Sequence, residues 1–285
     1  MQANTPSRTA QGAAMHRAAH QLIDKPPVFR DPLALQIIGR EAAADLRAGG
    51  EPGAALNAAV KGEGLRLFVA TRSRFTEDCL AEAMARGVHQ YVLLGAGLDT
   101  FAYRGAREGL RVFEVDHPAT QGWKRARLDD MGIAKPDWVI YTPVDFERET
   151  LREGLARAGF DFARPAMFAW LGVTPYLTRE AVMNTLGFIA SLAEQSEVVF
   201  DYAEPTKNHS ETQRAHFEAM AARVAAAGEP FKSFYEAEPL ARELKALGFS
   251  LAEDWDTDTL NARYFAGRTD GLKLRGRAHL MRARV

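Results

Sequence analysis

The chain has 285 residues, 47% of them hydrophobic and 26% charged, so it can bury a full core and is not a disordered polymer. Its 36 lysine and arginine residues nearly balance 37 aspartate and glutamate residues, and the net charge of −1 argues against a nucleic acid or an anionic membrane as a partner. No apolar run approaches the roughly 18 residues of a membrane span, and residues 1–20 lack the apolar segment of a secretory signal.

The N-terminal part of the chain, residues 1–63, is expected to form a helical extension. Asp31 is a suitable N-cap for a helix with Pro32 at its first position. The glycines and proline of residues 49–53 predict a loop. The expected helices are 17–23, 32–38 and 41–47.

From residue 64 the pattern changes to helices that alternate with short apolar strands. A long helix over 65–86 is expected to end at Gly87. Strands are expected at 90–94, 110–115, 139–144, 166–171 and 197–202, with helices at 117–131, 147–158 and 179–193. This alternation predicts a doubly wound, mostly parallel α/β sheet with helices on both faces.

After Tyr202 the pattern becomes helical and charged as far as Arg223. A helix over 239–247 is expected to end at Gly248, and the late strands expected at 249–251 and 276–283 bring the sheet to seven. We interpret the chain as one domain without internal repeats. Its expected parts are an N-terminal cap (1–63), a core (64–202), a helical insert (203–235) and the last part of the sheet (236–285).

The chain contains a single cysteine, Cys79. One thiol excludes an internal disulfide and a cysteine-rich zinc site, and a cytoplasmic location fits this composition best. Cys79 shares the apolar side of its expected helix with Leu80 and Met84. We therefore interpret it as a core residue and not as a nucleophile.

A glycine-rich turn, Gly95-Ala96-Gly97, follows the first strand directly. Glycines at this place let the backbone approach a ligand at the carboxyl edge of a parallel sheet, where ligands bind. The third glycine of a dinucleotide fingerprint is absent, since Thr100 takes its place, so the motif alone does not specify a nucleotide.

The second strand ends in an acid. Asp116 follows Gly97 by 19 residues, a spacing at which a carboxylate can accept hydrogen bonds from both hydroxyls of a ribose. Glu114 lies on the same side, one step deeper in the sheet. Asp116 could also cap the helix that begins at Pro118, and the two roles are compatible.

The third strand ends in Asp145 followed by Phe146. This pair suits an adenine, because the carboxylate can accept from the exocyclic amine while the ring packs on the base. The alternative is that Asp145 is the N-cap of the helix expected over 147–158.

Four ordered motifs together resemble the leucine carboxyl methyltransferase family, and more narrowly its bacterial branch of S-adenosylmethionine-dependent O-methyltransferases. They are GAGLDT at 95–100, FEVDHP at 113–118, PVDF at 143–146 and LGVTPYL at 171–177. The resemblance covers nearly the whole chain, from Ser7 to Arg268. It implies a Rossmann-like fold and S-adenosylmethionine as the cofactor.

The resemblance also implies roles for particular residues. Arg72, or less aptly Arg74, is similar to the arginine that pairs with the methionyl carboxylate, which a guanidinium clamps with two N–H groups. The residues that would surround the remainder of the cofactor are Gly95, Ala96 and Gly97 for the amino acid part, Asp116 for the ribose, and Asp145 and Phe146 for the adenine. Arg17 loosely resembles a basic residue that the N-terminal segment folds over the cofactor.

Leu171 departs from the family pattern. Many members carry a glutamate at this position, where the acid helps to hold the methionyl amino group. Backbone carbonyls near Gly95 can substitute for it, because an ammonium needs only acceptors. We interpret Leu171 as a variant of the cofactor site and not as a sign of an inactive protein.

Candidates for the catalytic and substrate-binding residues follow the strands. The candidate catalytic residues are His117, Tyr176 and Tyr202, with Glu204 as a further polar group at the sheet edge. The candidate substrate residues are Tyr176, Tyr202, Tyr264 and Arg268. For each of them packing or helix capping is the alternative, and no spacing of histidines and acids indicates a metal.

These observations predict an S-adenosylmethionine-dependent methyltransferase that acts on a hydroxyl or carboxyl oxygen of a small molecule. A protein carboxyl methyltransferase and a non-catalytic cofactor-binding regulator are the alternatives within the family. A nicotinamide-dependent oxidoreductase is the alternative outside it, but the chain has no Tyr-x-x-x-Lys pair, since Tyr202 and Lys207 are five residues apart. The acceptor and the oligomeric state stay open.

Overall fold

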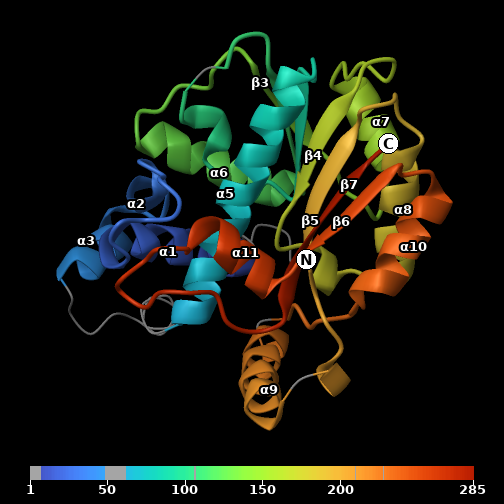
Figure 1. Ribbon diagram of the computed structural model, residues 1–285. Coiled ribbons are helices and arrows are strands. Elements are labelled where there is room, and N and C mark those ends of the chain that lie inside the picture. Colours follow the sequence, from blue (N-terminus) through green and yellow to red (C-terminus); the bar gives the residue numbers. More distant parts are fainter. Residues whose placement is uncertain (1–7, 49–61, 106, 209, 227) are drawn as a thin grey trace. The chain divides into compact units, whose positions relative to one another are not determined.

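The computed structural model describes residues 8–48, 62–105, 107–208, 210–226 and 228–285 (Figure 1). Its strands form a seven-stranded sheet in the order β3-β2-β1-β4-β5-β7-β6. The strands are β1 (Gln90–Leu94), β2 (Arg111–Asp116), β3 (Val139–Pro143), β4 (Ala166–Trp170), β5 (Glu197–Ala203), β6 (Leu251–Trp255) and β7 (Ala278–Arg284). The mostly parallel α/β sheet predicted from the sequence is confirmed.

The described residues fall into two compact units. The first comprises the chain up to Glu77 together with Gly95–Phe160, and the second comprises Asp78–Leu94 and Asp161–Val285. Each unit contains strands of the sheet together with helices of its own.

The first unit is built on the parallel pair of β2 and β3, in which Asp116 is paired with Pro143. Helix α6 (Pro118–Asp130) leaves β2 and begins with His117 as N-cap and a proline in its first turn, the position that tolerates a missing N–H group. Helix α7 (Leu151–Arg157) begins with a capping box between Thr150 and Glu153.

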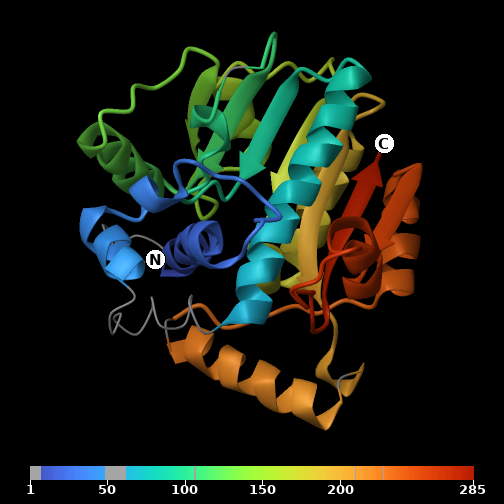
Figure 2. The same cartoon turned by 60° about the vertical axis from the view of Figure 1, so that its left-hand side comes forward.

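Three N-terminal helices cover part of the first unit, and they lie together in Figure 2: α1 (Arg8–Ile23), α2 (Ala34–Ile37) and α3 (Arg40–Ala48). Ala14 and Ala18 of α1 are completely buried in one cluster with Ile37, Leu98 and Leu128. Because alanine is small, α1 can approach its neighbours closely. The N-terminal helical extension predicted from the sequence is therefore present.

A buried ion cluster joins α1 to the long helix α5 (Glu63–Ala85). Asp24 is 2.8 Å from His20 Nδ1 and 2.9 Å from Arg66 Nε, and its side chain is 2% exposed. Burial raises the pKa of Asp24, but the hydrogen bonds and charges of His20 and Arg66 outweigh it and hold the pKa at about 2. The carboxylate therefore stays charged at this position.

The second unit contains the other five strands. β1, β4 and β5 are parallel, whereas β7 lies antiparallel between β5 and β6. Helices α8 (Arg179–Ala190) and α10 (Ala237–Leu247) pack side by side in both ribbon views. The other helices of this unit are α9 (Glu211–Ala226) and α11 (Thr257–Tyr264).

Several predicted boundaries differ from the structure. The strand expected at 249–251 begins two residues later, at Leu251, because Phe249 donates its N–H to Leu244 O in the turn that ends α10. Asp31 is not the N-cap of α2, because that cap is Leu33. The N-cap of α7 is Thr150, so the helix starts four residues after the expected position. Helix α11 was not predicted, and the loop expected at 49–53 lies outside the described residues.

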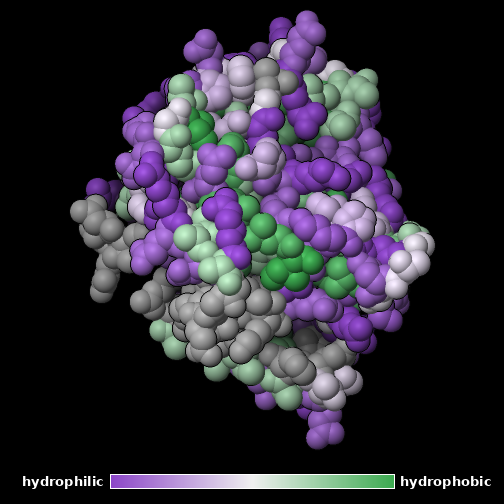
Figure 3. Space-filling view, turned by 90° about the vertical axis from the view of Figure 1, so that its left-hand side faces the viewer, coloured by the Kyte–Doolittle hydropathy of each residue, from purple (hydrophilic) through white to green (hydrophobic). Residues whose placement is uncertain are grey.

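Charged and polar side chains cover most of the surface that Figure 3 shows. The face seen in Figure 3 is mostly hydrophilic, with hydrophobic side chains gathered in a smaller patch. Among the described residues, no helix combines the length and the hydropathy that a membrane span requires.

Gly154 in α7 provides a test of the packing of the first unit. A Cβ atom there would overlap Val144 Cγ2, and Val144 is completely buried. We expect Gly154→Ala to lower the free energy of unfolding by about 1–3 kcal/mol, because overpacking outweighs the better helix propensity of alanine. Urea denaturation measures this change.

Gly122 in α6 is the matched control. It is exposed, and a Cβ atom there would meet nothing within 4 Å. Gly122→Ala should raise the free energy of unfolding by about 0.5–1 kcal/mol. Equal effects of the two substitutions would contradict the close contact between α7 and Val144.

Candidate functional site at the carboxyl ends of the strands

The glycine-rich turn follows β1 in a tight conformation. Gly95 and Gly97 have φ angles of +68° and +48°, values that side chains rarely adopt. The N–H groups of Gly95 and Ala96 donate to Val115 O, which fastens the turn to β2. Gly95 is exposed, whereas Ala96 and Gly97 are buried, and a Cβ atom on Gly97 would lie 3.1 Å from Ala10 Cβ. The exposed part of the turn is therefore its first residue.

Asp116 is held at the tip of β2 by two backbone donors. Gly97 N–H donates to one carboxylate oxygen over 2.6 Å, and His117 N–H donates to the other over 2.7 Å. Burial raises the pKa of Asp116, and these two donors oppose that effect. A carboxylate offers about four acceptor positions, so it has capacity for two more hydrogen bonds. This is the geometry expected of a ribose-binding acid.

The cap of α6 is His117, not Asp116. His117 Nδ1 accepts from Ala119 N–H over 3.2 Å, and the predicted alternative role of Asp116 as the cap of this helix is wrong. His117 was a candidate catalytic residue, and in the structure it carries out the capping role that was its alternative.

Asp145 and Phe146 follow β3 close to Asp116. Val144 N–H donates to Asp116 O over 2.9 Å, so the ends of β2 and β3 lie together. Asp145 accepts from Glu147 N–H over 3.1 Å, within a turn and not as the cap of α7. Phe146 is 61% exposed, so its ring is accessible to a ligand. The structure thus brings the predicted ribose and adenine residues to one edge.

Glu114 lies deeper in β2 and is completely buried. Lys124 Nζ is 2.8 Å from its carboxylate, and the Tyr103 hydroxyl donates to it over 3.3 Å. Burial raises the pKa of Glu114, and the charge of Lys124 opposes this. Because both members of this pair are buried, Glu114 stabilises β2 and α6 and does not reach a ligand.

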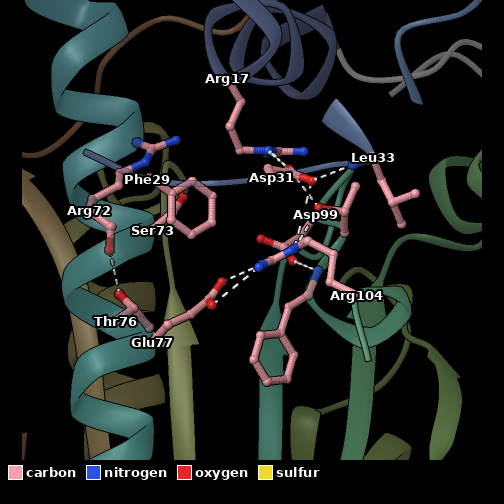
Figure 4. A network of polar contacts seen from close by, with 12 residues as sticks. Arg17, Phe29, Asp31, Leu33, Arg72, Ser73, Thr76, Glu77, Asp99 and Arg104 are labelled. Carbon is pink, nitrogen blue, oxygen red and sulfur yellow. Dashed lines mark hydrogen bonds and ion pairs between the residues drawn. The ribbon is translucent and has the colours of Figure 1, made fainter. Parts of the chain in front are cut away.

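A polar network connects α1 to the glycine-rich turn (Figure 4). Arg17 donates to Asp31 over 2.8 Å and to Leu98 O over 2.6 Å. Thr100 donates its hydroxyl to the same Asp31 oxygen over 2.7 Å, and Arg104 donates to Thr100 over 3.1 Å. The Arg17 side chain therefore holds the turn in place by binding the backbone carbonyl of Leu98. The sequence did not indicate this role.

The network continues to helix α5, along which Figure 4 shows Arg72, Thr76 and Glu77. Arg104 Nη1 donates to Glu77 over 3.2 Å, while Thr76 donates to the carbonyl of Arg72. The Arg72 side chain is half-buried, with its guanidinium carbon 6.0 Å from the Phe68 ring centroid. Arg74 is exposed. Arg72 is thus the more enclosed of the two arginines predicted for the cofactor carboxylate.

In the second unit, Leu171 follows β4 and is half-buried. The next residue, Gly172, donates its N–H to Asp201 over 2.5 Å, and the Thr174 hydroxyl donates to the carbonyl of Asp201. Asp201 of β5 therefore fastens the loop after β4. The family pattern has an acid at this position. The side chain of Leu171 cannot accept a hydrogen bond, so it cannot replace that acid.

The four candidate substrate residues lie in the second unit and differ in exposure. Tyr202 is 2% exposed and its hydroxyl donates to Asp254 over 2.5 Å. Tyr264 donates to Asp78 over 2.8 Å, and Arg268 is bound to Asp270 over 2.5 Å. These three side chains bind protein partners, and their role in substrate binding stays a prediction.

Tyr176 is half-buried, as are Tyr264 and Arg268. Its ring is stacked on Phe231 with the ring centroids 5.3 Å apart, directly after the loop that Asp201 fastens.

Cys79 is completely buried, and burial raises the pKa of its thiol, which agrees with a core residue. The described residues contain no group of three or more histidines, cysteines and acids placed to hold a metal ion.

The fold and the strand-tip residues define an open α/β protein with its polar groups at the carboxyl ends of the strands. The chain belongs to the leucine carboxyl methyltransferase family, which matches residues 10–190 and confirms the resemblance in the sequence. A Bacillus subtilis protein, YktD, named as an S-adenosyl-L-methionine-dependent methyltransferase, is 30% identical over 99% of both chains.

Two solved structures share the fold. A Thermobifida fusca protein described as a methyltransferase has a TM-score of 0.58 and 18% identity, and the match covers 99% of this chain and 95% of that one. A Streptomyces avermitilis protein of the DUF574 family has a TM-score of 0.58 and 16% identity, over 99% of this chain and 98% of that one. At such identities the likeness concerns the fold alone.

Proposed function

We propose that this protein transfers a methyl group from S-adenosylmethionine to an oxygen atom of a small molecule. The coarse part of this statement follows from the family: the chain is an S-adenosylmethionine-dependent methyltransferase. The oxygen target, the small acceptor and a cytoplasmic location are the parts that we propose. Asp116, held by Gly97 and His117 at the tip of β2, is the observation that carries the cofactor assignment.

The residues of the first unit fit this cofactor. The Asp116 carboxylate retains acceptor positions for two ribose hydroxyls, and Asp145 with the exposed Phe146 offers an acceptor and a ring to the adenine. Gly95 is exposed where the methionyl part would approach the backbone. Arg72 is the guanidinium that would pair with the methionyl carboxylate.

S-adenosylmethionine, when bound, supplies a methyl group on a positively charged sulfur that leaves as a neutral thioether. The protein therefore has to align the acceptor oxygen with the methyl group and exclude water. The hydrogen-bonded network around Arg17 and Asp31 anchors the glycine-rich turn through the carbonyl of Leu98. A carboxylate acceptor needs no base, whereas a hydroxyl acceptor does.

Thr100 argues against a nicotinamide cofactor. It occupies the position of the third fingerprint glycine, and its hydroxyl donates to the buried Asp31.

Two further functions compete with the proposed one: methylation of a protein C-terminus, and regulation by a chain that binds the cofactor without catalysis. Leu171 is the feature that favours the regulator.

Calorimetric titration separates these possibilities. We expect S-adenosylmethionine and S-adenosylhomocysteine to bind with one site per chain, and NADH, the control, not to bind. Cofactor binding without transfer of a tritiated methyl group to any small molecule or peptide would favour the regulator. Binding of NADH alone would overturn the proposed function.

A further inference from the structure

His117 caps helix α6 with only one of its two ring nitrogens. Its Nδ1 accepts from Ala119 N–H over 3.2 Å. In a neutral imidazole one nitrogen accepts and the other carries the proton, and the hydrogen bond that one nitrogen makes decides which. The proton of His117 is therefore on Nε2, on the side of the ring that faces away from Ala119.

The Nε2–H group keeps its capacity to donate. Within the described part of the chain, no group accepts a hydrogen bond from it. His117 is half-buried, so a ligand at the tip of β2 can reach the ring. The capping bond at Nδ1 thus fixes the orientation of the ring and leaves one accessible donor directly after Asp116.

The neighbouring Asp116 carboxylate offers acceptors only. Gly97 N–H and His117 N–H occupy two of its roughly four acceptor positions, and the two that are left fit two ribose hydroxyls. A hydroxyl that donates its hydrogen still has two lone pairs, and the bond to a carboxylate makes its oxygen a better acceptor. A diol bound to Asp116 therefore has acceptors to satisfy, and it needs a donor close by.

The backbone after Asp116 does not supply that donor. His117 N–H is bound to Asp116, and Ala119 N–H is bound to His117 Nδ1. Pro118 between them has no N–H. In residues 117–119 the group that stays able to donate is therefore Nε2–H of His117.

We propose that His117 binds the ribose together with Asp116, which accepts from the two hydroxyls while His117 Nε2–H donates to the oxygen of one of them. This inference rests on the proposed function and adds a residue to its ribose site. Gly97, Asp116, His117 and Ala119 all belong to the first unit. The pair recognises a free diol, because it matches both the donors and an acceptor of that group.

His117→Asn separates the cap from the proposed contact. Asparagine is a good N-cap, with Oδ1 in the place of Nδ1, but it has no atom at the position of Nε2. Calorimetry should show S-adenosylhomocysteine bound about 3- to 10-fold more weakly, the loss of one hydrogen bond, at an unchanged melting temperature. His89→Asn, an exposed change just before β1, is the matched control and should alter neither quantity. Wild-type affinity in His117→Asn overturns the inference.

His117→Gln makes the reverse change. Glutamine is long enough to place an N–H donor near the position of Nε2, but it is not among the good N-caps. The melting temperature should fall by a few degrees, whereas S-adenosylhomocysteine should bind more tightly than to His117→Asn. If the glutamine variant is the weaker binder, affinity follows the cap and not the donor, and the inference is wrong.

Ligands that lack one hydroxyl test the contact directly. The probes are the 2′-deoxy and 3′-deoxy analogues of S-adenosylhomocysteine, each titrated into the wild type and into His117→Asn. With at least one analogue the two proteins should bind equally well, because the oxygen that Nε2–H contacts is gone, as in a double-mutant cycle. An undiminished difference between the two proteins with both analogues contradicts the inference.

These measurements also separate failure of the inference from failure of the proposed function. If the wild type binds S-adenosylhomocysteine and His117→Asn binds it equally well, the inference alone fails, and His117 is only a cap. If the wild type binds neither S-adenosylmethionine nor S-adenosylhomocysteine, the proposed function fails and the inference fails with it.

Discussion

Asp116→Ala is expected to weaken the binding of S-adenosylmethionine and S-adenosylhomocysteine about 100-fold. The substitution removes the carboxylate that would accept from the ribose hydroxyls, and it leaves the N–H groups of Gly97 and His117 without their acceptor. Hydrogen bonds to a charged group contribute about 1.5–3 kcal/mol, and about 1.4 kcal/mol corresponds to tenfold in affinity. Calorimetry with both ligands measures the loss.

Asp130→Ala is the control for this substitution. Asp130 is exposed at the end of α6, on the helix that begins next to Asp116. The control should keep wild-type affinity, and thermal melting should show both variants folded. Wild-type affinity in Asp116→Ala would remove the ribose-binding role and leave the cofactor assignment to the family membership alone.

The strands and their polar tips were predictable because their signals are local. A short apolar run such as Gln90–Leu94 followed at once by glycines indicates a buried strand and a turn with positive φ angles. Asp116 and Asp145 could be placed at neighbouring strand tips in the same way. Each of these motifs spans only a few residues and specifies the structure of the same residues, so it can be recognised in a single sequence.

The network around the glycine-rich turn was not predictable because its members are distant in the chain. Thr100 and Asp31 are 69 residues apart, and Arg17 and Leu98 are 81 residues apart. An aspartate in a capping pattern can also be misassigned when its partner is distant in the chain. Asp31 precedes a proline and a helix as an N-cap does, and one carboxylate oxygen accepts from Leu33 N–H. The other oxygen binds the guanidinium of Arg17, and the helix begins only after Leu33.

The last strands were harder to predict for a different reason. β6 reads Leu-Ala-Glu-Asp-Trp and is half-buried along its whole length at the edge of the sheet, so it lacks the apolar run of a central strand. Its Asp254 is held by His279 and Tyr202 from two other strands. These contacts of Asp254 become visible only when three separate segments are folded together.

Asp31→Asn is expected to lower the free energy of unfolding by about 3–5 kcal/mol, the cost of leaving a buried charge without its partner. The Asp31 side chain is completely buried and accepts hydrogen bonds from Arg17, Thr100 and the N–H of Leu33. An asparagine side chain keeps the volume but loses the charge and one acceptor, so the Arg17 guanidinium stays buried against a neutral group. Urea denaturation gives the change.

The same substitution separates a structural network from one that also shapes the cofactor site. Arg17 holds the Leu98 carbonyl and Thr100 holds Asp31, so the glycine-rich turn should move when the network is broken, and cofactor affinity should fall in the folded variant. Asp45→Asn, an exposed change in α3, should alter neither quantity. If Asp31→Asn lowers the free energy of unfolding but keeps wild-type cofactor affinity, the network serves stability alone. If it lowers both quantities, α1 also sets the geometry of the turn.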